Sequence, residues 1–478
     1  MKKYFSDSVE TITSAPVGSL ILKNAVPTII TMMVTAIYNT ADTFFVSKLG
    51  TSASGAVGII FSLMTLIQAG GFMIGMGSGS ITSRALGEGN LKKAEIYCST
   101  AIIFVFMLGT FLSVFGTIFN EKIVVFLGAT QTILPFGKAY AKYIIFACPF
   151  MMTSFVMNNQ LRFQGRAAFS MIGMVTGGIL NIILDPIFIF GFGWGISGAA
   201  AATLVSQIVS FFILLSMFLH GKSAVKISLK SVSRKFKTYA NIITTGLPSL
   251  FRQGMASFSG ILMNLSAAKY GSKILEGGRL LLPGNILISE IDTSLLSDAA
   301  VAGMSIANRI SMLLLSVAIG MGQGFQPVAG INLGAKKYDR VKQSLFFLLK
   351  STTAIMAVLG LTVFIFAPQI TESFRDDKLV IAVSSTALRF IACVLPLHSI
   401  IFGTNMLLQV AGVKKSATFL SSLRQGIIFL PCIIILPYIV SFFGFNGILG
   451  IQMTPAVSDF LSALIALPFL INFLRKLK

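Results

Sequence analysis

The chain contains 478 residues, of which 55% are hydrophobic and 11% are charged, and it carries a formal net charge of +21. Its mean hydropathy of +0.86 excludes an ordinary soluble protein and is typical of a polytopic helical membrane protein. Because the basic residues flank apolar runs, the positive charge indicates membrane orientation, and we expect no nucleic-acid partner.

Apolar runs of about 20 residues or more predict twelve transmembrane helices, and hence an all-α fold that lies in the lipid bilayer. The expected helices cover residues 18–47, 54–83, 94–119, 138–160, 167–191, 196–219, 239–268, 299–332, 341–367, 382–409, 416–441 and 446–474. The external connection over residues 269–298 is much longer than the loop after the first helix, and we expect a surface hairpin there.

Lys and Arg residues are concentrated on one side of this arrangement. The positive-inside rule therefore places both termini in the cytosol, with the chain in the inner (plasma) membrane. The first residues contain acids where the apolar part of a signal peptide would lie, so they read as a leader. The expected parts are a cytosolic leader (1–17), an N-lobe (18–219), a basic cytosolic linker (220–238), a C-lobe (239–474) and a cytosolic tail (475–478).

The two halves of the chain repeat one another. Gly87 recurs as Gly334, Gly165 as Gly412 and Asn158 as Asn405, all at one separation along the sequence. Such a repeat indicates a transporter made of two pseudo-symmetric six-helix lobes, with a substrate cavity between them.

The first helix carries Asp42 well inside its apolar run, where an ionised carboxylate costs several kcal/mol. Tyr38 lies one helical turn before Asp42 and so shares its face. Pro27 removes one backbone hydrogen bond and gives the helix a place to bend. Asp42 is therefore a candidate ion-site residue; the alternative is an Asp that is merely hydrogen-bonded within the bundle.

The fifth helix carries Asn181 and Asp185, four residues apart and on one face. Asn158 on the fourth helix and Thr203 on the sixth could add neutral oxygen ligands. Two carboxylates in one dry cavity are costly to keep ionised together, so we expect one retained proton or one Na⁺ between them. Asp185 could instead be an interfacial acid, because it lies near the external end of its helix.

The C-lobe lacks counterparts of both acids in the repeat register but has charges of its own. Its possible polar network comprises Arg389, His398, Arg424 and Asp459. Asp459 could simply be the counter-ion of the neighbouring cations, and His398 could be a hydrogen-bonded structural residue.

The sequence contains no nucleophile and base constellation, no metal-ligand spacing and no phosphate-binding glycine loop, so an enzyme is not expected. No cofactor is expected beyond the coupling ion, and no metal beyond a possible Na⁺ at Asp42 and Asp185. The four cysteines lie singly in apolar runs and read as small core residues.

Several motifs together resemble the multidrug and toxic compound extrusion (MATE) family. They are the P-x(10)-YNxxDTxFV segment at Pro27–Val46, the LGEGN turn at Leu86, NNQLRxQG at Asn158–Gly165, NIILDPIFI at Asn181–Ile189 and LRQG at Leu423–Gly426. The last resembles the bacterial branch that exports cationic dyes and biocides. Some relatives carry a Glu eight residues after the proline of the seventh helix, but Ala256 stands there in this chain, so a second-lobe cation site should be absent or rebuilt.

The resemblance implies drug export against inward H⁺ or Na⁺, with Pro27 at the bend of the first helix. It implies a first-lobe cation site lined by Tyr38, Asp42, Asn158, Asn181, Asp185 and Thr203. We therefore expect a multidrug exporter of amphipathic organic cations that works as a monomer by alternating access. The alternative is a flippase for a lipid-linked oligosaccharide or related lipid, because the arginines of the second lobe could bind a pyrophosphate.

Overall fold

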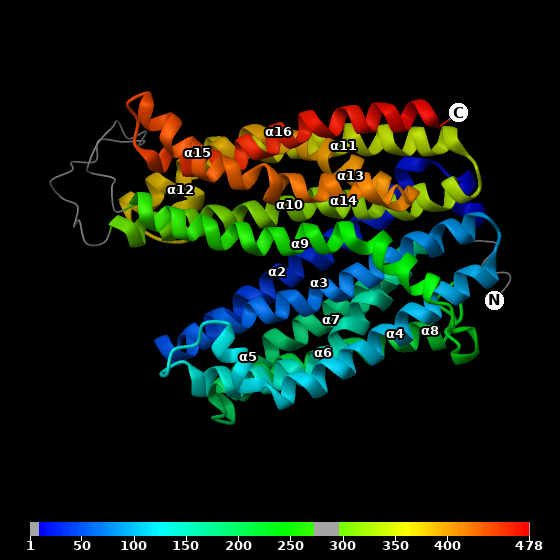
Figure 1. The fold of residues 1–478 in the computed structure, drawn as a ribbon, viewed down its shortest axis with the longest axis horizontal. Coiled ribbons are helices and arrows are strands. Elements are labelled where there is room, and N and C mark those ends of the chain that lie inside the picture. Colours follow the sequence, from blue (N-terminus) through cyan, green and yellow to red (C-terminus); the bar gives the residue numbers. More distant parts are fainter. Residues whose placement is uncertain (1–8, 272–295, 478) are drawn as a thin grey trace. The chain divides into compact units, whose positions relative to one another are not determined.

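The structure is a computed structural model that describes residues 9–271 and 296–477, and within these ranges it contains helices and no strands (Figure 1). Most of the expected hairpin at 269–298 and the first part of the leader lie outside the described residues. The helices of the N-terminal half are α2 (Val17–Ser47), α3 (Thr51–Gly87), α4 (Leu91–Ile118), α5 (Asn120–Phe126), α6 (Leu134–Phe163), α7 (Ala167–Pro186) and α8 (Gly195–Leu219). Those of the C-terminal half are α9 (Phe236–Gly271), α10 (Leu296–Gly334), α11 (Tyr338–Glu372), α12 (Lys378–Val394), α13 (His398–Ala411), α14 (Lys414–Ser422), α15 (Phe429–Phe442) and α16 (Gly447–Lys476).

Eleven segments among the described residues are long and apolar enough to cross a membrane, and α9 matches the remaining expected helix, the seventh at 239–268. The helix expected at 382–409 is divided into α12 and α13 by a short 3₁₀ turn that contains Pro396. The one expected at 416–441 is divided into α14 and α15 by the π-helical turn Leu423–Ile427. Each divided helix still forms one candidate membrane span, Lys378–Ala411 and Lys414–Phe442, so the predicted multi-pass, all-helical fold is confirmed.

Large apolar side chains are exposed along many of these helices, as expected where lipid replaces water as the solvent. Leu66 is 66% exposed and Ile118 is 71% exposed. The helix α6 differs from the other spans of the N-terminal half because most of its length is buried. It packs against α3, α4 and α8, and α7 packs against α2 and α8 (Figure 1). The polar side chains of α6 and α7 are therefore held inside the bundle.

The chain separates into two compact units. The first comprises Met1–Gly254, Gln323–Leu345 and Leu407–Lys414, and the second comprises Met255–Gly322, Phe346–Met406 and Lys415–Lys478. The first unit contains the whole expected N-lobe together with ends of helices from the second half. The predicted lobe boundaries at 219 and 239 stay predictions, because packing groups these helix ends with the first six helices.

Glycines allow these helix ends to approach the N-terminal helices closely. A Cβ on Gly87 would overlap the carbonyl oxygen of Ile331, and a Cβ on Gly334 would overlap that of Arg84. The sequence repeat relates the two contacts, because Gly87 corresponds to Gly334 and Arg84 corresponds to Ile331. The sequence repeat is thus a repeat of contacts, in which two backbones cross reciprocally at positions where only glycine fits.

Candidate functional site

The two candidate acids of the first unit are buried on different helices. Asp42 lies on α2 and is 7% exposed, and Asp185 lies in the last turn of α7 and is 0% exposed. Pro186 directly follows Asp185, and there the α-helix gives way to the π-helical turn Ile187–Gly191. Such turns are frequent at functional sites. Asp42 and Asp185 are close enough to interact electrostatically, so the structure brings the two acids into one site.

Tyr140 of α6 joins this site, although the sequence did not single it out. Its hydroxyl donates a hydrogen bond to Oδ2 of Asp42 over 2.9 Å, and its side chain is fully buried. The same hydroxyl lies near Thr203 of α8. Lys138 and Lys142 flank Tyr140 in the sequence, which is typical of an aromatic residue at the membrane surface. Because of these flanking lysines, the sequence did not indicate that the Tyr140 side chain points into the bundle.

Asn181 links the second acid to α8. Its amide nitrogen lies 3.2 Å from Oδ1 of Asp185 and 3.3 Å from Oγ1 of Thr203. Asn181 is 1% exposed and Thr203 is 3% exposed. Tyr38, one turn before Asp42 on α2, is also buried. The structure therefore brings together five of the six residues that the sequence assigned to the cation site.

Three oxygen atoms of this group have no hydrogen-bond partner among the described residues. They are Oδ1 of Asp42, Oδ2 of Asp185 and Oδ1 of Asn181. A buried acceptor without a donor costs about 1–3 kcal/mol, and more when it is charged. Among the described residues, no three His, Cys, Asp or Glu side chains gather as a metal cluster would require. Two carboxylates with neutral oxygens fit a proton or one monovalent cation such as Na⁺.

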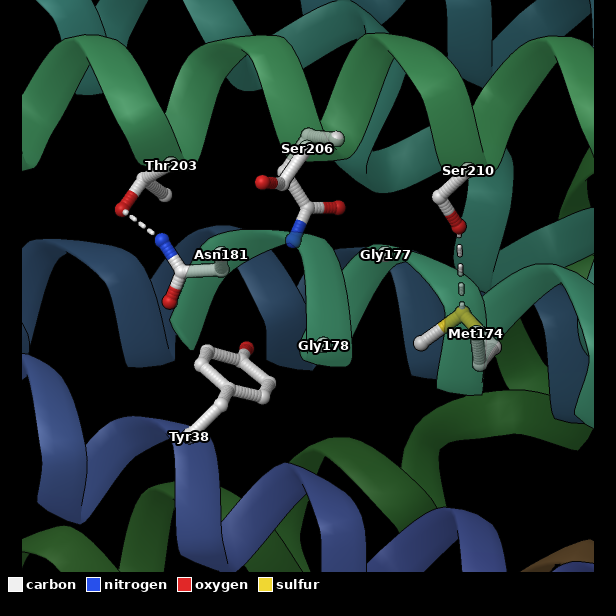
Figure 2. Close-up of a pocket in the computed structure, with 9 residues that line it drawn as sticks. Tyr38, Met174, Gly177, Gly178, Asn181, Thr203, Ser206 and Ser210 are labelled. Atoms are coloured by element: carbon white, nitrogen blue, oxygen red, sulfur yellow. Dashed lines mark hydrogen bonds between the residues drawn. The ribbon is translucent and has the colours of Figure 1, made fainter. Parts of the chain in front are cut away.

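Figure 2 shows a narrow cavity between α7 and α8 that Tyr38 borders on a third side. Gly178 leaves room for the Tyr38 ring, because a Cβ there would lie 3.3 Å from the ring carbon Cδ1. The cavity measures about 10 Å³, close to the volume of one water-sized probe. The lining atoms Oδ1 of Asn181, Oγ of Ser206 and Oε1 of Gln207 lack described partners. The cavity thus has the room and the polar partners that a buried water requires.

Polar side chains continue along α8 beyond Thr203. Ser206 and Ser210 are buried at one-turn intervals on the face that α7 covers, and the cavity ends where Oγ of Ser210 contacts Sδ of Met174 at 3.9 Å (Figure 2). The α7 face opposite them consists of Met174, small glycines and Asn181. The candidate site therefore extends as a thin polar seam between the two helices.

The structure does not bring Asn158 to the two acids. Asn158 lies on α6 about 27 Å beyond Tyr140, at 1.5 Å per residue. Its amide nitrogen donates to the backbone oxygen and the hydroxyl of Ser170, over 3.1 and 3.2 Å. In the second unit Asn405 donates to the backbone oxygen of Ala417 over 2.8 Å, twelve residues further along the chain as in the first unit. Both asparagines join successive helices, so the shared role is structural.

Pro27 lies within α2, far from Asp42 along the helix. Proline donates no backbone hydrogen bond to the preceding turn. The hydroxyl of Thr31 donates to the Pro27 carbonyl over 2.8 Å, and that of Thr28 donates to the Asn24 carbonyl over 2.7 Å. These hydroxyls bond neighbouring carbonyls and not that of Lys23, the carbonyl that Pro27 leaves without its helical donor. The assignment of Pro27 as a hinge stays a prediction.

The acid of the second unit contacts one arginine and one histidine. Oδ1 of Asp459 lies 2.5 Å from Nε of Arg424, and Oδ2 lies 3.0 Å from Nε2 of His398. Asp459 and His398 are both nearly inaccessible. Arg389 is not part of this group; its guanidinium lies over the ring of Phe364, 5.9 Å from the centroid. Asp459 is therefore the counter-ion of Arg424, with both its oxygens occupied.

Comparisons with known proteins agree with this architecture. The MatE family model matches residues 27–187 and 281–435. The curated "Multidrug export protein MepA" of Staphylococcus saprophyticus is 26% identical over 444 residues, which is 93% of this chain and 91% of that one. MepA of Staphylococcus aureus (strain MRSA252) is 24% identical over 436 residues, which is 91% of this chain and 90% of that one.

Solved structures show the same fold. One described as "Crystal structure of MATE in complex with MaL6" has a TM-score of 0.86 and 24% identity, over 98% of both chains. Another, described as "Outward-facing conformation of a multidrug resistance MATE family transporter of the MOP superfamily", has a TM-score of 0.87 and 23% identity, again over 98% of both. Since the family model covers more than half of the sequence and the fold agrees throughout, the chain belongs to the MatE family of membrane transporters.

Proposed function

We propose that this transporter exports amphipathic organic cations and couples their export to inward movement of H⁺ or Na⁺ at Asp42 and Asp185. The observation that supports this most directly is the pair of buried carboxylates on α2 and α7, each with one oxygen that lacks a described hydrogen-bond donor. Buried, unpaired acids in a membrane protein are costly and mark ion pathways. The relatives named as multidrug export proteins support the class of substrate.

The coupling ion binds among the free oxygens of Asp42, Asp185 and Asn181. Tyr140 and Thr203 hold this group in place from α6 and α8. The neighbouring polar cavity provides a position for a water that could complete the coordination of Na⁺ or carry a proton. Residue types alone do not choose between the ions, because a carboxylate with amide and hydroxyl oxygens suits either.

Coupling requires that the ion and the drug bind the two access states with different affinities. In the proposed cycle the externally open state takes up the ion at Asp42 and Asp185. Neutralisation of these acids lets α2 bend near Pro27, and the drug is released outside. Loss of the ion on the opposite side restores the two charges and resets the cycle.

We propose that the chain lies in the plasma membrane with both termini in the cytosol. The bacterial MepA relatives and the distribution of Lys and Arg support this position. A monomer is the proposed oligomeric state.

The first experiment is dye export by proteoliposomes under separately imposed pH and Na⁺ gradients, with wild type and Asp42→Asn compared. Export that follows one gradient and disappears in the variant would support the proposal and name the ion. The matched control is Asp339→Asn, which removes an exposed carboxylate at the start of α11 and should leave export unchanged. Wild-type export by Asp42→Asn would refute the role of this acid.

The lipid-linked oligosaccharide flippase stays as the alternative for one reason, the arginines of the second half. The contacts weaken this reading, since Arg424 is neutralised by Asp459 and Arg389 lies over an aromatic ring. If wild type and Asp42→Asn both fold normally but neither exports dye, lipid translocation becomes the next activity to measure.

A further inference from the structure

A second, larger cavity of the first unit is lined mainly by cations. It measures about 300 Å³ and lies where the end of α3 and the starts of α4, α9 and α14 meet. Arg84, Lys93 and Lys414 contribute positive charges, and Glu88 is the one carboxylate among the described residues that line it. The positive-inside rule places these helix ends at the cytosolic face. The lining therefore carries two more positive charges than negative ones.

Hydrogen bonds hold the cations of this cavity in fixed positions. Nη1 of Arg84 donates to the backbone oxygen of Ala411 over 2.8 Å. Gly412 has a φ of 82°, and a Cβ at this position would overlap the Arg84 guanidinium. Glycine is thus needed there both for its backbone conformation and for the space that Arg84 occupies. Arg84 is therefore positioned by backbone oxygens, and the Glu88 carboxylate is close enough to interact with its charge.

Lys414 and Lys93 differ in their partners. Nζ of Lys414 donates to Oδ1 of Asn241 over 3.0 Å and to Oγ1 of Thr244 over 2.7 Å, and both acceptors are neutral. Lys93 is the partner of Glu88, at 2.9 Å. The positive charges of Arg84 and Lys414 are close enough to repel one another. An anion between them would relieve this repulsion.

The cavity is also lined by a buried hydroxyl that has no hydrogen-bond partner among the described residues. Thr245 is 1% exposed and lines the cavity, and its Oγ1 has no hydrogen-bond partner among the described residues. The volume corresponds to about ten waters at ~30 Å³ each, which is ample for a phosphate group with some of its hydration. Arginine, lysine and hydroxyl donors together form the usual chemistry of a phosphate site.

We propose that this cavity binds a phosphate-bearing anion, held by Arg84, Lys93, Lys414 and Thr245. The source of the phosphate is either the headgroup of an anionic lipid at the membrane surface or a free phosphate of the surrounding solution. Both present the same doubly hydrogen-bonding oxygens to the guanidinium and the ammonium groups.

The test measures binding of two probes to the full-length protein, independently of transport. Thermal unfolding is recorded in neutral detergent during titration with inorganic phosphate, and in nanodiscs of phosphatidylcholine with increasing phosphatidylglycerol. The variant Lys93→Gln/Lys414→Gln removes two lining charges. The control Lys92→Gln/Lys415→Gln removes two charges at the adjacent, exposed positions and leaves the same net charge. The single variant Lys93→Gln repeats the measurement without altering the Lys414 hydrogen bonds.

Saturable stabilisation of the wild type and of the control, weakened about thirty-fold in the lining variant, would support the site; this ratio is about 2 kcal/mol. Stabilisation by both probes indicates a site for free phosphate, and stabilisation by phosphatidylglycerol alone indicates a lipid headgroup. Equal weakening in lining variant and control would show a diffuse surface charge and would overturn the proposal. Lack of saturable binding by either probe would overturn it as well.

A bound anion would join segments from both halves of the sequence, since α3 and α4 belong to the first half and α9 and α14 to the second. If it binds, it therefore stabilises the arrangement in which these helix ends are together. This consequence rests on the proposed export function. Its readout is the dye-export rate with and without phosphatidylglycerol, which can fail while the binding measurement succeeds.

Discussion

Removal of the Tyr140 hydroxyl tests the candidate cation site with the smallest change that the structure offers. Tyr140→Phe keeps the buried ring and deletes the hydrogen bond of 2.9 Å to Oδ2 of Asp42. The structure shows no other donor to Asp42 among the described residues, and its Oδ1 lacks one altogether. The ion-free, ionised form of Asp42 therefore loses its stabilising donor, while the ion-bound form depends on it less.

The magnitude follows from the charge on the acceptor. A hydrogen bond to a charged group contributes about 1.5–3 kcal/mol. If this term is lost mainly from the ion-free state, the apparent affinity for the coupling ion rises by about 10- to 150-fold. Release of the ion on the far side becomes correspondingly slower, so the maximal export rate should fall while the ion concentration at half-maximal rate also falls.

The assay is dye export by proteoliposomes as a function of the driving ion, with folding checked by thermal unfolding. Tyr143→Phe is the matched control, because Tyr143 lies one turn further along α6 and the structure shows no bond from it to either acid. The control should behave as wild type. If Tyr140→Phe keeps the wild-type half-maximal ion concentration within twofold, the hydroxyl does not act on the ion site, and this reasoning is refuted.

Two further predictions concern residues whose roles the structure distinguishes. Gly246→Ala should destabilise the protein by about 1–3 kcal/mol, because its methyl group would overlap the Met73 carbonyl, whereas Gly254→Ala on the same helix has open space and should be neutral or stabilising in thermal unfolding. Equal melting temperatures for the two variants would contradict the close crossing of α3 and α9. Asn158→Ala should lower the melting temperature and leave the ion dependence of export unchanged, in contrast to Asn181→Ala, which should change it; an altered ion dependence in Asn158→Ala would return that residue to the cation site.

The twelve helices and the repeat were predictable from the sequence because both are local patterns. Apolar length sets each span, and Gly87 and Gly334 mark equivalent turns whatever the packing. Asp42, Asp185 and Asn181 were predictable for a similar reason, since a polar residue in an apolar run is visible without a structure. The division of the helix at Pro396 was harder to predict from the sequence, because a membrane helix can accommodate proline with or without a break.

Sequence reasoning did not single out Tyr140, and it assigned Asn158 to a site to which the structure does not bring it. Both are polar groups in the same helix, and the sequence does not reveal which of its faces meets α2 and which meets α7. Tyr140 has flanking lysines that suggest the membrane surface, yet its hydroxyl reaches Asp42. Asn158 has a counterpart in Asn405, and that repetition was the available sign of a structural role. Asn158 and Asn405 occur in both lobes and make the helix-to-helix contact that both lobes contain. The candidate ion site instead depends on acids that occur in the first lobe only.

The contrast between the two units bears on the number of coupling sites. In the second unit both oxygens of Asp459 are occupied, by Arg424 and His398, so a cation there would have to displace a buried ion pair. Breaking a buried pair costs about 3–5 kcal/mol, which a monovalent cation would have to repay on binding. In the first unit Asp42 and Asp185 each present an oxygen without a described donor, and the cation displaces nothing. Under the proposed function we therefore expect ion binding at the first lobe only, and this asymmetry predicts one coupling site per transporter.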